Sequence, residues 1–441
     1  MGKKALVLGG GGAKGAYQIG VWKAFIELGI NFDIITGTSV GALNGALMVQ
    51  GDYDIAEKLW DSAEFENVFK NNNRESVRDI ATVTDMVKFA LANPTGEKTM
   101  DMSPLEEILD KEIDEKKVRD SLTDFGLVVV EFPNLRHHQI MKQDIQDGSL
   151  NKFLMASSSC FPVTAPYEID GVKYIDGAYY DNLPINLAIE NGATEITTVD
   201  IEGIGLVKRP KKRDLQVTYI RPYWDLGAIF DFEQSGFERN KKLGYYDALK
   251  MFGWLEGYCY TFETGEMRSN YQRYEEKIPA LAFKIRRIMK SPAAKAIKAI
   301  GGESAIVFLS REKWGKIPER MFCRVAELAG EVFEIPPENK YRFKEFNDLI
   351  ISEYERYKNE ALPFEEYRDD ILQLSYAFTQ MTNVNKKMMA AIIIAELLKT
   401  DSAHIKLAEL FPKEYCTALY LNLLLYETNN ETNLISKGDI S

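Results

Sequence analysis

The feature that most constrains the fold is a turn with the pattern Gly-x-Ser-x-Gly at residues 37–41. The apolar segment 32–36 before it predicts a short buried strand, and the small and apolar residues after it predict a helix. In that context Gly37 and Gly41 let the chain turn sharply and the helix pack closely. We therefore predict that Ser39 lies at a helix N-terminus, where partial positive charge favours an anionic oxygen. An incidental serine in a turn of small residues is the alternative.

A second glycine-rich segment lies upstream, between a predicted strand at residues 4–8 and a predicted helix ending near residue 28. Its glycines include Gly10, Gly11 and Gly12. Backbone N–H groups in such a loop can point at one spot and hold negative charge.

Three interpretations compete for this loop. Its spacing matches a dinucleotide-binding fingerprint, but the acidic residue that this fingerprint needs would be Asp33, which precedes its strand instead of ending it. A phosphate-binding P-loop is excluded because the Gly-Lys-Ser/Thr sequence is missing. The third interpretation is an oxyanion hole for Ser39. We favour it because adjacent parallel strands bring both loops to the same edge of the sheet.

Strand and helix patterns alternate up to about residue 222, which predicts an α/β domain with a largely parallel sheet over residues 1–222. Residues 54–112 predict surface helices, either a helical layer or a lid over the site. Further strands are predicted at residues 125–130, 174–178, 195–199 and 215–220, and a short helix at residues 151–156.

The pattern changes after residue 222, and we expect residues 223–441 to form a mostly helical C-terminal domain of unknown role. Helices are predicted at residues 233–255, 283–300, 319–328, 338–360 and 366–398, and a strand at residues 305–309.

The net charge of −12 argues against general affinity for nucleic acid or anionic membranes. The four cysteines are far apart and fit a reducing compartment. The chain starts without an apolar leader, and no apolar run reaches the length of a membrane span. We expect a cytoplasmic protein, with peripheral contact at the inner membrane surface as an option. Basic segments at 208–213 and 284–298 could make that contact, although solvated surface is the favoured interpretation.

A serine nucleophile needs a base, and the chain has only three histidines: His137, His138 and His404. None has a context that distinguishes it, since the first two follow a Pro-Asn turn after a strand and the third lies in a polar segment. A carboxylate can serve as the base if it lies within hydrogen-bond reach of the hydroxyl and has a raised pKa.

Asp176 is the best candidate for this carboxylate because it follows an apolar strand and precedes a tight turn. Asp170 and Asp181 are the competitors. Asp170 precedes Gly171 in what the sequence predicts as a hairpin turn, and Asp181 could cap the helix that begins near Pro184.

Taken together, the glycine-rich loop at 10–15, the turn at 37–41 and Asp-Gly-Ala at 176–178 form an ordered motif set. This set resembles the patatin-like phospholipases, over roughly the first half of the chain. The segments 156–162 and 181–184 also look like the family.

The resemblance implies a three-layer α/β/α domain with a Ser–Asp dyad and no histidine. It implies Ser39 as the nucleophile, Asp176 as its base, and the N–H groups of Gly10, Gly11 and Gly12 as the oxyanion hole. Lys14 stands where many members carry arginine, so it is a possible supporting residue together with the glycines of the turn.

The function expected from this resemblance is hydrolysis of an acyl lipid, a phospholipid or a lysophospholipid, through an acyl-enzyme. No cofactor and no metal ion is needed. The alternatives are a dinucleotide-binding oxidoreductase and a non-enzymatic scaffold with the same fold. The sequence assigns no oligomeric state and no acyl-chain preference.

Overall fold

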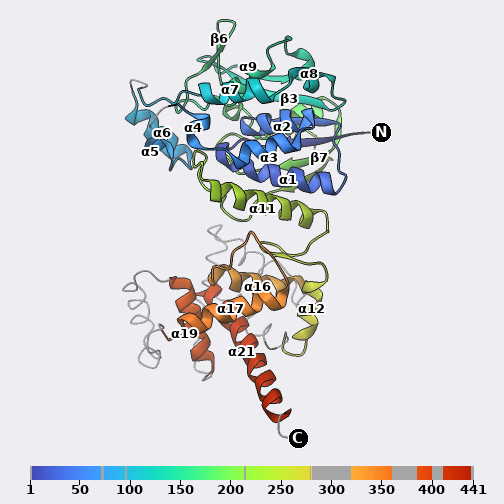
Figure 1. The fold of residues 1–441 in the computed structure, drawn as a ribbon, viewed down its shortest axis with the longest axis vertical. Coiled ribbons are helices and arrows are strands. Elements are labelled where there is room, and N and C mark those ends of the chain that lie inside the picture. The colour runs from blue at the N-terminus through green and yellow to red at the C-terminus, as the bar shows by residue number, and fades with distance from the viewer. Residues whose placement is uncertain are drawn as a thin grey trace. The chain divides into compact units, whose positions relative to one another are not determined.

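The computed structural model describes residues 2–70, 74–94, 97–212, 215–278, 280, 319–359, 385–399 and 411–438. The chain divides into two compact units, Met1–Phe252 and Gly253–Ser441. Figure 1 shows a first unit of strands flanked by helices and a second unit in which helices dominate. The predicted fold class, an α/β domain followed by a mostly helical region, is confirmed.

Helix α11 (Gln234–Met251) belongs to the first unit, although the sequence led us to expect a domain boundary at residue 222. It packs along α1 (Ala16–Glu27), and the two backbones come close where each helix has a glycine. A Cβ atom on Gly20 would lie 1.8 Å from a backbone oxygen of α11, and one on Gly244 would lie 2.0 Å from a backbone oxygen of α1. The division between the units therefore falls after this helix.

The first unit is built on an eight-stranded sheet with the strand order β5-β6-β3-β2-β1-β7-β8, in which β4 also pairs with β3. The pairs β3–β2, β2–β1, β1–β7 and β7–β8 are parallel, whereas β4 and β6 pair antiparallel with β3, and β5 pairs antiparallel with β6. The strands are β1 (Lys3–Leu8), β2 (Ile34–Gly37), β3 (Asp124–Phe132), β4 (His137–Met141), β5 (Tyr167–Ile169), β6 (Val172–Asp176), β7 (Ala193–Val199) and β8 (Gln216–Ile220).

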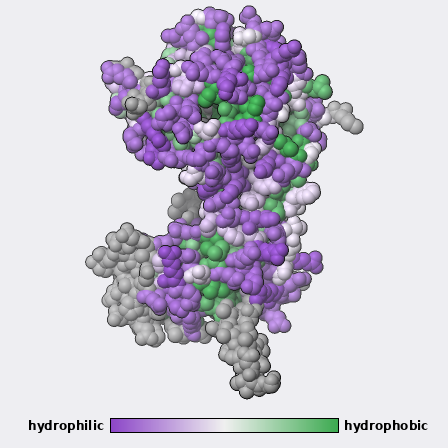
Figure 2. All heavy atoms as spheres, viewed as in Figure 1, coloured by the Kyte–Doolittle hydropathy of each residue, from purple (hydrophilic) through white to green (hydrophobic). Residues whose placement is uncertain are grey.

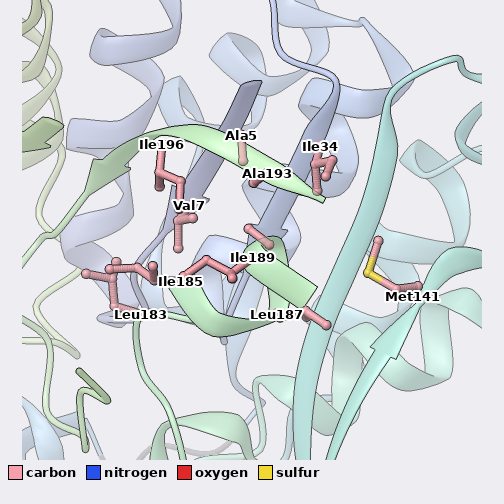
Figure 3. Packing of buried hydrophobic residues seen from close by; sticks show 11 residues of the cluster. Ala5, Val7, Ile34, Met141, Leu183, Ile185, Leu187, Ile189, Ala193 and Ile196 are labelled. Atoms are coloured by element: carbon pink, nitrogen blue, oxygen red, sulfur yellow. The ribbon is translucent and has the colours of Figure 1, made fainter. Parts of the chain in front are cut away.

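Alternate residues of each strand point to opposite sides of the sheet, so both faces carry apolar side chains. Helices cover both faces and bury these side chains. Val7 and Ile34 pack with the apolar residues of α10 (Ile185–Glu190) in the cluster that Figure 3 shows. Leu8 points to the other face, where it lies against α2 (Val40–Gln50). The result is the three-layer α/β/α arrangement that the motif set implied.

The segment between α2 and β3 is helical, as predicted. Helix α6 (Val83–Ala92) begins with a capping box, in which the Thr82 hydroxyl accepts from the Asp85 N–H and the Asp85 carboxylate accepts from the Thr82 N–H. The other helices of this segment and the one after β4 are α3 (Tyr53–Asp61), α4 (Phe65–Val68), α5 (Arg74–Val77), α7 (Ser103–Glu112), α8 (Glu115–Asp120) and α9 (Leu150–Ser157).

The second unit consists mainly of helices, with one short parallel pair formed by β9 (Thr261–Phe262) and β10 (Lys340–Tyr341). The helix predicted at 283–300 and the strand predicted at 305–309 lie outside the described residues. No helix in the described part of either unit is both long enough and apolar enough to cross a membrane. The helices of this unit are α12 (Glu266–Arg273), α16 (Glu319–Val332), α17 (Phe343–Tyr357), α19 (Lys386–Lys399) and α21 (Pro412–Gly438).

Candidate active site

Ser39 lies on the sharp turn between the end of β2 and the start of α2. Its backbone has φ 56° and ψ −132°, a conformation that residues other than glycine rarely adopt. Its N–H donates to the Oγ atom of Ser157 at 3.0 Å, and the Ser157 hydroxyl donates to the carbonyl oxygen of Val128 at 2.8 Å. The strand–turn–helix context that the sequence predicted is therefore present around this serine.

The two glycines of the turn have no room for side chains. A Cβ atom on Gly37 would lie 2.2 Å from the carbonyl oxygen of Gly41, and a Cβ atom on Gly41 would lie 2.4 Å from the carbonyl oxygen of Leu8. The turn can close this tightly, and α2 can start this close to β1, only because both positions lack a side chain.

Asp176 is the last residue of β6, and it is almost completely buried at 3% exposure. Its Oδ1 atom accepts the N–H of Ala178 at 2.8 Å, and Asp176 lines the same cavity as Ser39. Burial raises the pKa of Asp176 to about 7, although the Ala178 N–H and the nearby Ser39 side chain act in the opposite direction. A carboxylate with such a pKa can accept a proton near neutral pH.

The glycine-rich loop lies directly against Ser39. A Cβ atom on Gly10 would lie 2.9 Å from the Cβ of Ser39. The Gly10 N–H donates to the carbonyl oxygen of Asn182 at 3.2 Å, whereas Gly11 and Gly12 line the cavity that contains Ser39. Gly12 has φ 54°, and a Cβ atom there would lie 2.1 Å from the carbonyl oxygen of Ile229. The three glycines therefore differ in their contacts, although the sequence treats them alike.

The cavity next to Ser39 and Asp176 has a volume of about 610 Å³, and most of its wall is apolar. Helices α2, α3, α4, α6 and α7 contribute to it, together with the loops after β6 and after β7. Its apolar residues include Leu47, Leu59, Met86, Leu105 and Phe230. The helical layer predicted at 54–112 thus forms one wall of the cavity.

Two residues weighed from the sequence lie away from the cavity wall. Lys14 donates through Nζ to the carbonyl oxygen of Glu202 at 3.3 Å. Asp33 accepts the N–H of Lys4 at 2.8 Å at the start of β2, which is the opposite end of that strand from Ser39.

The two described histidines, His137 and His138, do not line the cavity that contains Ser39. His137 and His138 lie on β4, where the sequence predicted only an exposed turn. The ring of His137 stacks on Tyr180 with centroids 3.5 Å apart, and His138 Nε2 lies 2.7 Å from Oε1 of Glu131. Burial lowers the pKa of His137. The third histidine, His404, lies outside the described residues.

The competing aspartates have structural contacts. Asp170 has φ 50° in the turn between β5 and β6, as predicted for a hairpin. Asp181 is buried, and its Oδ1 atom accepts the N–H groups of Leu183 at 3.4 Å and Lys208 at 3.2 Å. Burial raises the pKa of Asp181 to about 6, but its carboxylate does not line the cavity.

Asn182 is a residue that the motif analysis named without giving it a role. Its backbone oxygen accepts the Gly10 N–H, and its Nδ2 atom donates to the carbonyl oxygen of Gly10 at 3.2 Å and to that of Gly203 at 3.4 Å. Asn182 thus holds the glycine-rich loop from both sides. The sequence signal that could have found it is its position directly after the Asp-Gly-Ala turn.

A second buried network supports the same loop. Gln18 donates through Nε2 to the carbonyl oxygen of Gly9 at 2.7 Å, and its Oε1 atom accepts Nδ2 of Asn44 at 2.8 Å. Trp60 Nε1 donates to Oδ1 of Asn44 at 3.1 Å. This chain of hydrogen bonds connects α1, α2 and α3 to the loop, and a sequence pattern gives no sign of it because the partners lie far apart along the chain.

The first unit is thus an α/β protein in which a serine on a strained strand–helix turn and a buried aspartate line one cavity beside a glycine-rich loop. Residues 6–189 match the model of the Patatin-like phospholipase family. Over these residues the chain is therefore similar to the patatin-like phospholipases.

Curated relatives are similar to this chain over 45% of its length. The mouse protein named patatin-like phospholipase domain-containing protein 6 is 30% identical over 201 residues, which are 45% of this chain and 13% of that protein. Lysophospholipase nte1 of Aspergillus terreus is 30% identical over 203 residues, which are 45% of this chain and 12% of that protein. The matched region is therefore a small part of these relatives.

Among solved structures, the crystal structure of VipD from Legionella pneumophila is similar with a TM-score of 0.39 and 14% sequence identity. The match covers 96% of this chain and 90% of that one.

Proposed function

We propose that the first unit hydrolyses the ester bond of an acyl lipid, with Ser39 as the nucleophile and Asp176 as its general base. The observation that carries this proposal is the position of Ser39, on a strained turn, beside the buried Asp176 in the wall of one apolar cavity, with the pKa of that carboxyl raised to about 7. A base with a pKa close to the working pH is effective in general base catalysis.

In the proposed mechanism Ser39 attacks the ester carbonyl while Asp176 accepts the hydroxyl proton. The negative charge that develops on the carbonyl oxygen is stabilised by backbone N–H groups of the glycine-rich loop. Gly11 and Gly12 are the primary donors, because the Gly10 N–H already donates to Asn182. The helix dipole of α2 adds positive potential at the nucleophile.

The alcohol then leaves with the proton from Asp176, and an acyl-enzyme remains on Ser39. Water attacks this ester while Asp176 again accepts a proton, and the fatty acid is released. Each of the two steps uses the same base and the same N–H donors, so no cofactor and no metal ion is required.

The substrate class follows from the cavity. Its largely aliphatic and aromatic wall beside Ser39 fits the hydrocarbon chain of a phospholipid or lysophospholipid, because an apolar chain gains free energy when it leaves water.

The proposal is tested by the release of p-nitrophenol from a medium-chain ester by the wild type, Ser39→Ala and Asp176→Asn. We expect both variants to lose the activity while their circular dichroism spectra remain unchanged. An active Ser39→Ala variant would refute the assignment of the nucleophile. An active Asp176→Asn variant would refute the assignment of the base and leave Ser39 in place.

A further inference from the structure

Helix α6 exposes an apolar stripe beside the mouth of the cavity. Val83, Val87 and Leu91 are four residues apart, so they share one side of the helix. All three are exposed, Leu91 by 77%, although the opposite side of the helix buries Met86 and Phe89. Val83 and Val87 also contribute to the cavity wall, so the stripe continues from the cavity onto the surface.

A second exposed apolar segment lies at the same mouth. Leu206 and Val207 are exposed by 58% and 51%, and Leu206 lines the cavity together with Val83 and Val87. Ile204 of the same loop packs against the buried cluster that contains Met86 of α6. The loop and the helix therefore border one opening. On the visible face of the first unit, Figure 2 shows hydrophobic surface near α2 and α7 enclosed by hydrophilic side chains.

Basic residues follow the apolar loop directly. Arg209, Lys211 and Lys212 are exposed, and Lys208 lies over the ring of Tyr180 at 4.3 Å from its centroid. Lys211 pairs with Glu190, whereas Arg209 and Lys212 form no ion pair with any residue in the described part of the chain. This local positive charge stands in a chain with a net charge of −12.

We propose that α6 and the loop 204–212 form a docking surface for an anionic lipid bilayer, from which a lipid enters the cavity. We call this surface the rim and define it by Val83, Val87, Leu91, Leu206 and Val207, with Arg209 and Lys212 as its charged border. The proposal rests on the proposed function, because it names the physical source of the substrate.

Two features favour a lipid surface over a protein partner. The exposed apolar residues of the rim are all aliphatic, and Val83, Val87 and Leu206 also line the wall of an apolar cavity. Aliphatic side chains can insert at the boundary between headgroups and acyl chains, while neighbouring arginine and lysine side chains contact anionic headgroups.

The test measures co-sedimentation of the Ser39→Ala protein with vesicles, so that binding is observed without turnover. One set of vesicles contains phosphatidylcholine alone, and the other contains phosphatidylcholine mixed with phosphatidylglycerol. We expect binding to the mixed vesicles, weakening as salt is added, and much less binding to phosphatidylcholine alone. Equal binding to both vesicle types, or no binding to either, would overturn the proposal.

Two double variants locate the surface. Leu91→Asp with Val207→Asp removes apolar contact at positions outside the cavity wall, and Arg209→Glu with Lys212→Glu reverses the charged border. Each should lower the partition onto mixed vesicles by about tenfold or more.

The matched control is Leu122→Asp with Lys116→Glu, which changes an exposed leucine and an exposed lysine that do not line the cavity. It should bind like the parent protein. Rim variants that bind like this control would refute the rim as the docking surface. If the rim variants kept vesicle binding but lost a concentration-dependent dimer, the rim would instead be a contact between two copies of the chain.

Activity separates this proposal from the proposed function. In an otherwise wild-type chain, both rim variants should hydrolyse the soluble p-nitrophenyl ester at an unchanged rate and hydrolyse vesicle lipid at least about tenfold more slowly. Soluble ester hydrolysis with no vesicle binding by the wild type would leave the function standing and refute the rim. Vesicle binding with no hydrolysis of any ester would refute the proposed function and leave the rim standing as a docking surface.

Discussion

Each of the two units buries a carboxylate, Asp176 in the first unit and Glu327 in the second. The two carboxylates have very different hydrogen-bond and charge partners. Glu327 on α16 is fully buried, and its Oε1 atom accepts the backbone N–H groups of Tyr258, Cys259 and Tyr260 at 2.6, 3.1 and 3.1 Å. Its Oε2 atom lies 3.4 Å from Nη1 of the buried Arg324. Asp176 instead accepts one backbone N–H and lies beside Ser39, and it forms no ion pair within the described residues.

The comparison teaches what distinguishes a structural carboxylate from a reactive one. Three amide donors and a guanidinium contact the Glu327 carboxylate and connect its helix to a neighbouring loop. Asp176 receives much less compensation for its burial, and its pKa therefore rises to about 7. We infer that burial without a cation keeps this group able to exchange a proton.

The largest expected effects come from the same conservative change at both positions. Asp176→Asn should lower kcat/KM for ester hydrolysis by about 10²–10⁴-fold, because the general base is lost, without lowering the free energy of unfolding. Glu327→Gln should lower the free energy of unfolding by about 2–3 kcal/mol, because three backbone N–H groups lose a charged acceptor and Arg324 keeps only its pair with Glu331, and should leave kcat/KM unchanged. Urea denaturation and ester hydrolysis measure the two quantities. A stability loss for Asp176→Asn as large as that for Glu327→Gln would abolish the contrast.

The pH dependence of activity comes next in size. Asp176 must be deprotonated to act as a base, so kcat/KM should fall about tenfold per pH unit below its pKa of about 7. An ordinary carboxylate would keep its activity down to about pH 4. A pH–rate profile between pH 5 and 8 measures the position of this limb, and a limb near pH 4 would contradict the assignment.

The raised pKa of Asp176 also predicts how the free energy of unfolding depends on pH. Because the folded state binds the Asp176 proton more tightly than the unfolded state, its contribution to the free energy of unfolding falls as pH rises from about 4 to about 7. Asp176→Asn lacks this contribution. The difference in stability between the variant and the wild type should therefore shift in favour of the variant across this range, as urea denaturation at several pH values would show.

A smaller effect is expected at Asn182, which contacts the glycine-rich loop and not the proton that is transferred. Asn182→Ala removes the side-chain hydrogen bonds to Gly10 and Gly203, so kcat should fall by roughly tenfold while the pH limb stays in place. Asn186→Ala is the matched control, because this equally buried asparagine contacts the backbone of Arg209 and Lys211 instead. Equal losses of kcat in both variants would argue against a positioning role for Asn182.

The smallest effect is expected at Lys14. Its ammonium group contacts only the carbonyl oxygen of Glu202 among the hydrogen bonds of the described residues, and it lies outside the cavity wall. Lys14→Ala should change kcat/KM by less than about threefold, since a solvent-accessible contact of this kind contributes little. A loss of a hundredfold would show that Lys14 supports the site directly.

Local patterns in the sequence were sufficient for the core of the site. The strand–turn–helix around Ser39 and the strand–loop–helix around the glycines depend on residues that are neighbours in the chain, and parallel pairing of β1 and β2 brings the two loops together. The largely parallel sheet was predictable for the same reason, because short apolar runs alternate with helical patterns.

Only the tertiary structure decided which distant groups meet. It brought Asp176, and not Asp170 or Asp181, to Ser39, because β6 pairs antiparallel with β3 and ends beside the turn. It joined α11 to the first unit through close contacts at Gly20 and Gly244, which no local pattern reveals.

The contacts of the glycine-rich loop and the shape of the cavity were also decided only by the tertiary structure. The sequence treats Gly10 like its neighbours, but its N–H donates to Asn182, a residue far along the chain. The cavity wall comes from five helices and several loops, and its shape depends on how their side chains pack. The sequence by itself determined the elements that carry the reactive groups, and long-range packing determined their partners, because burial and hydrogen bonding depend on residues that only the fold brings together.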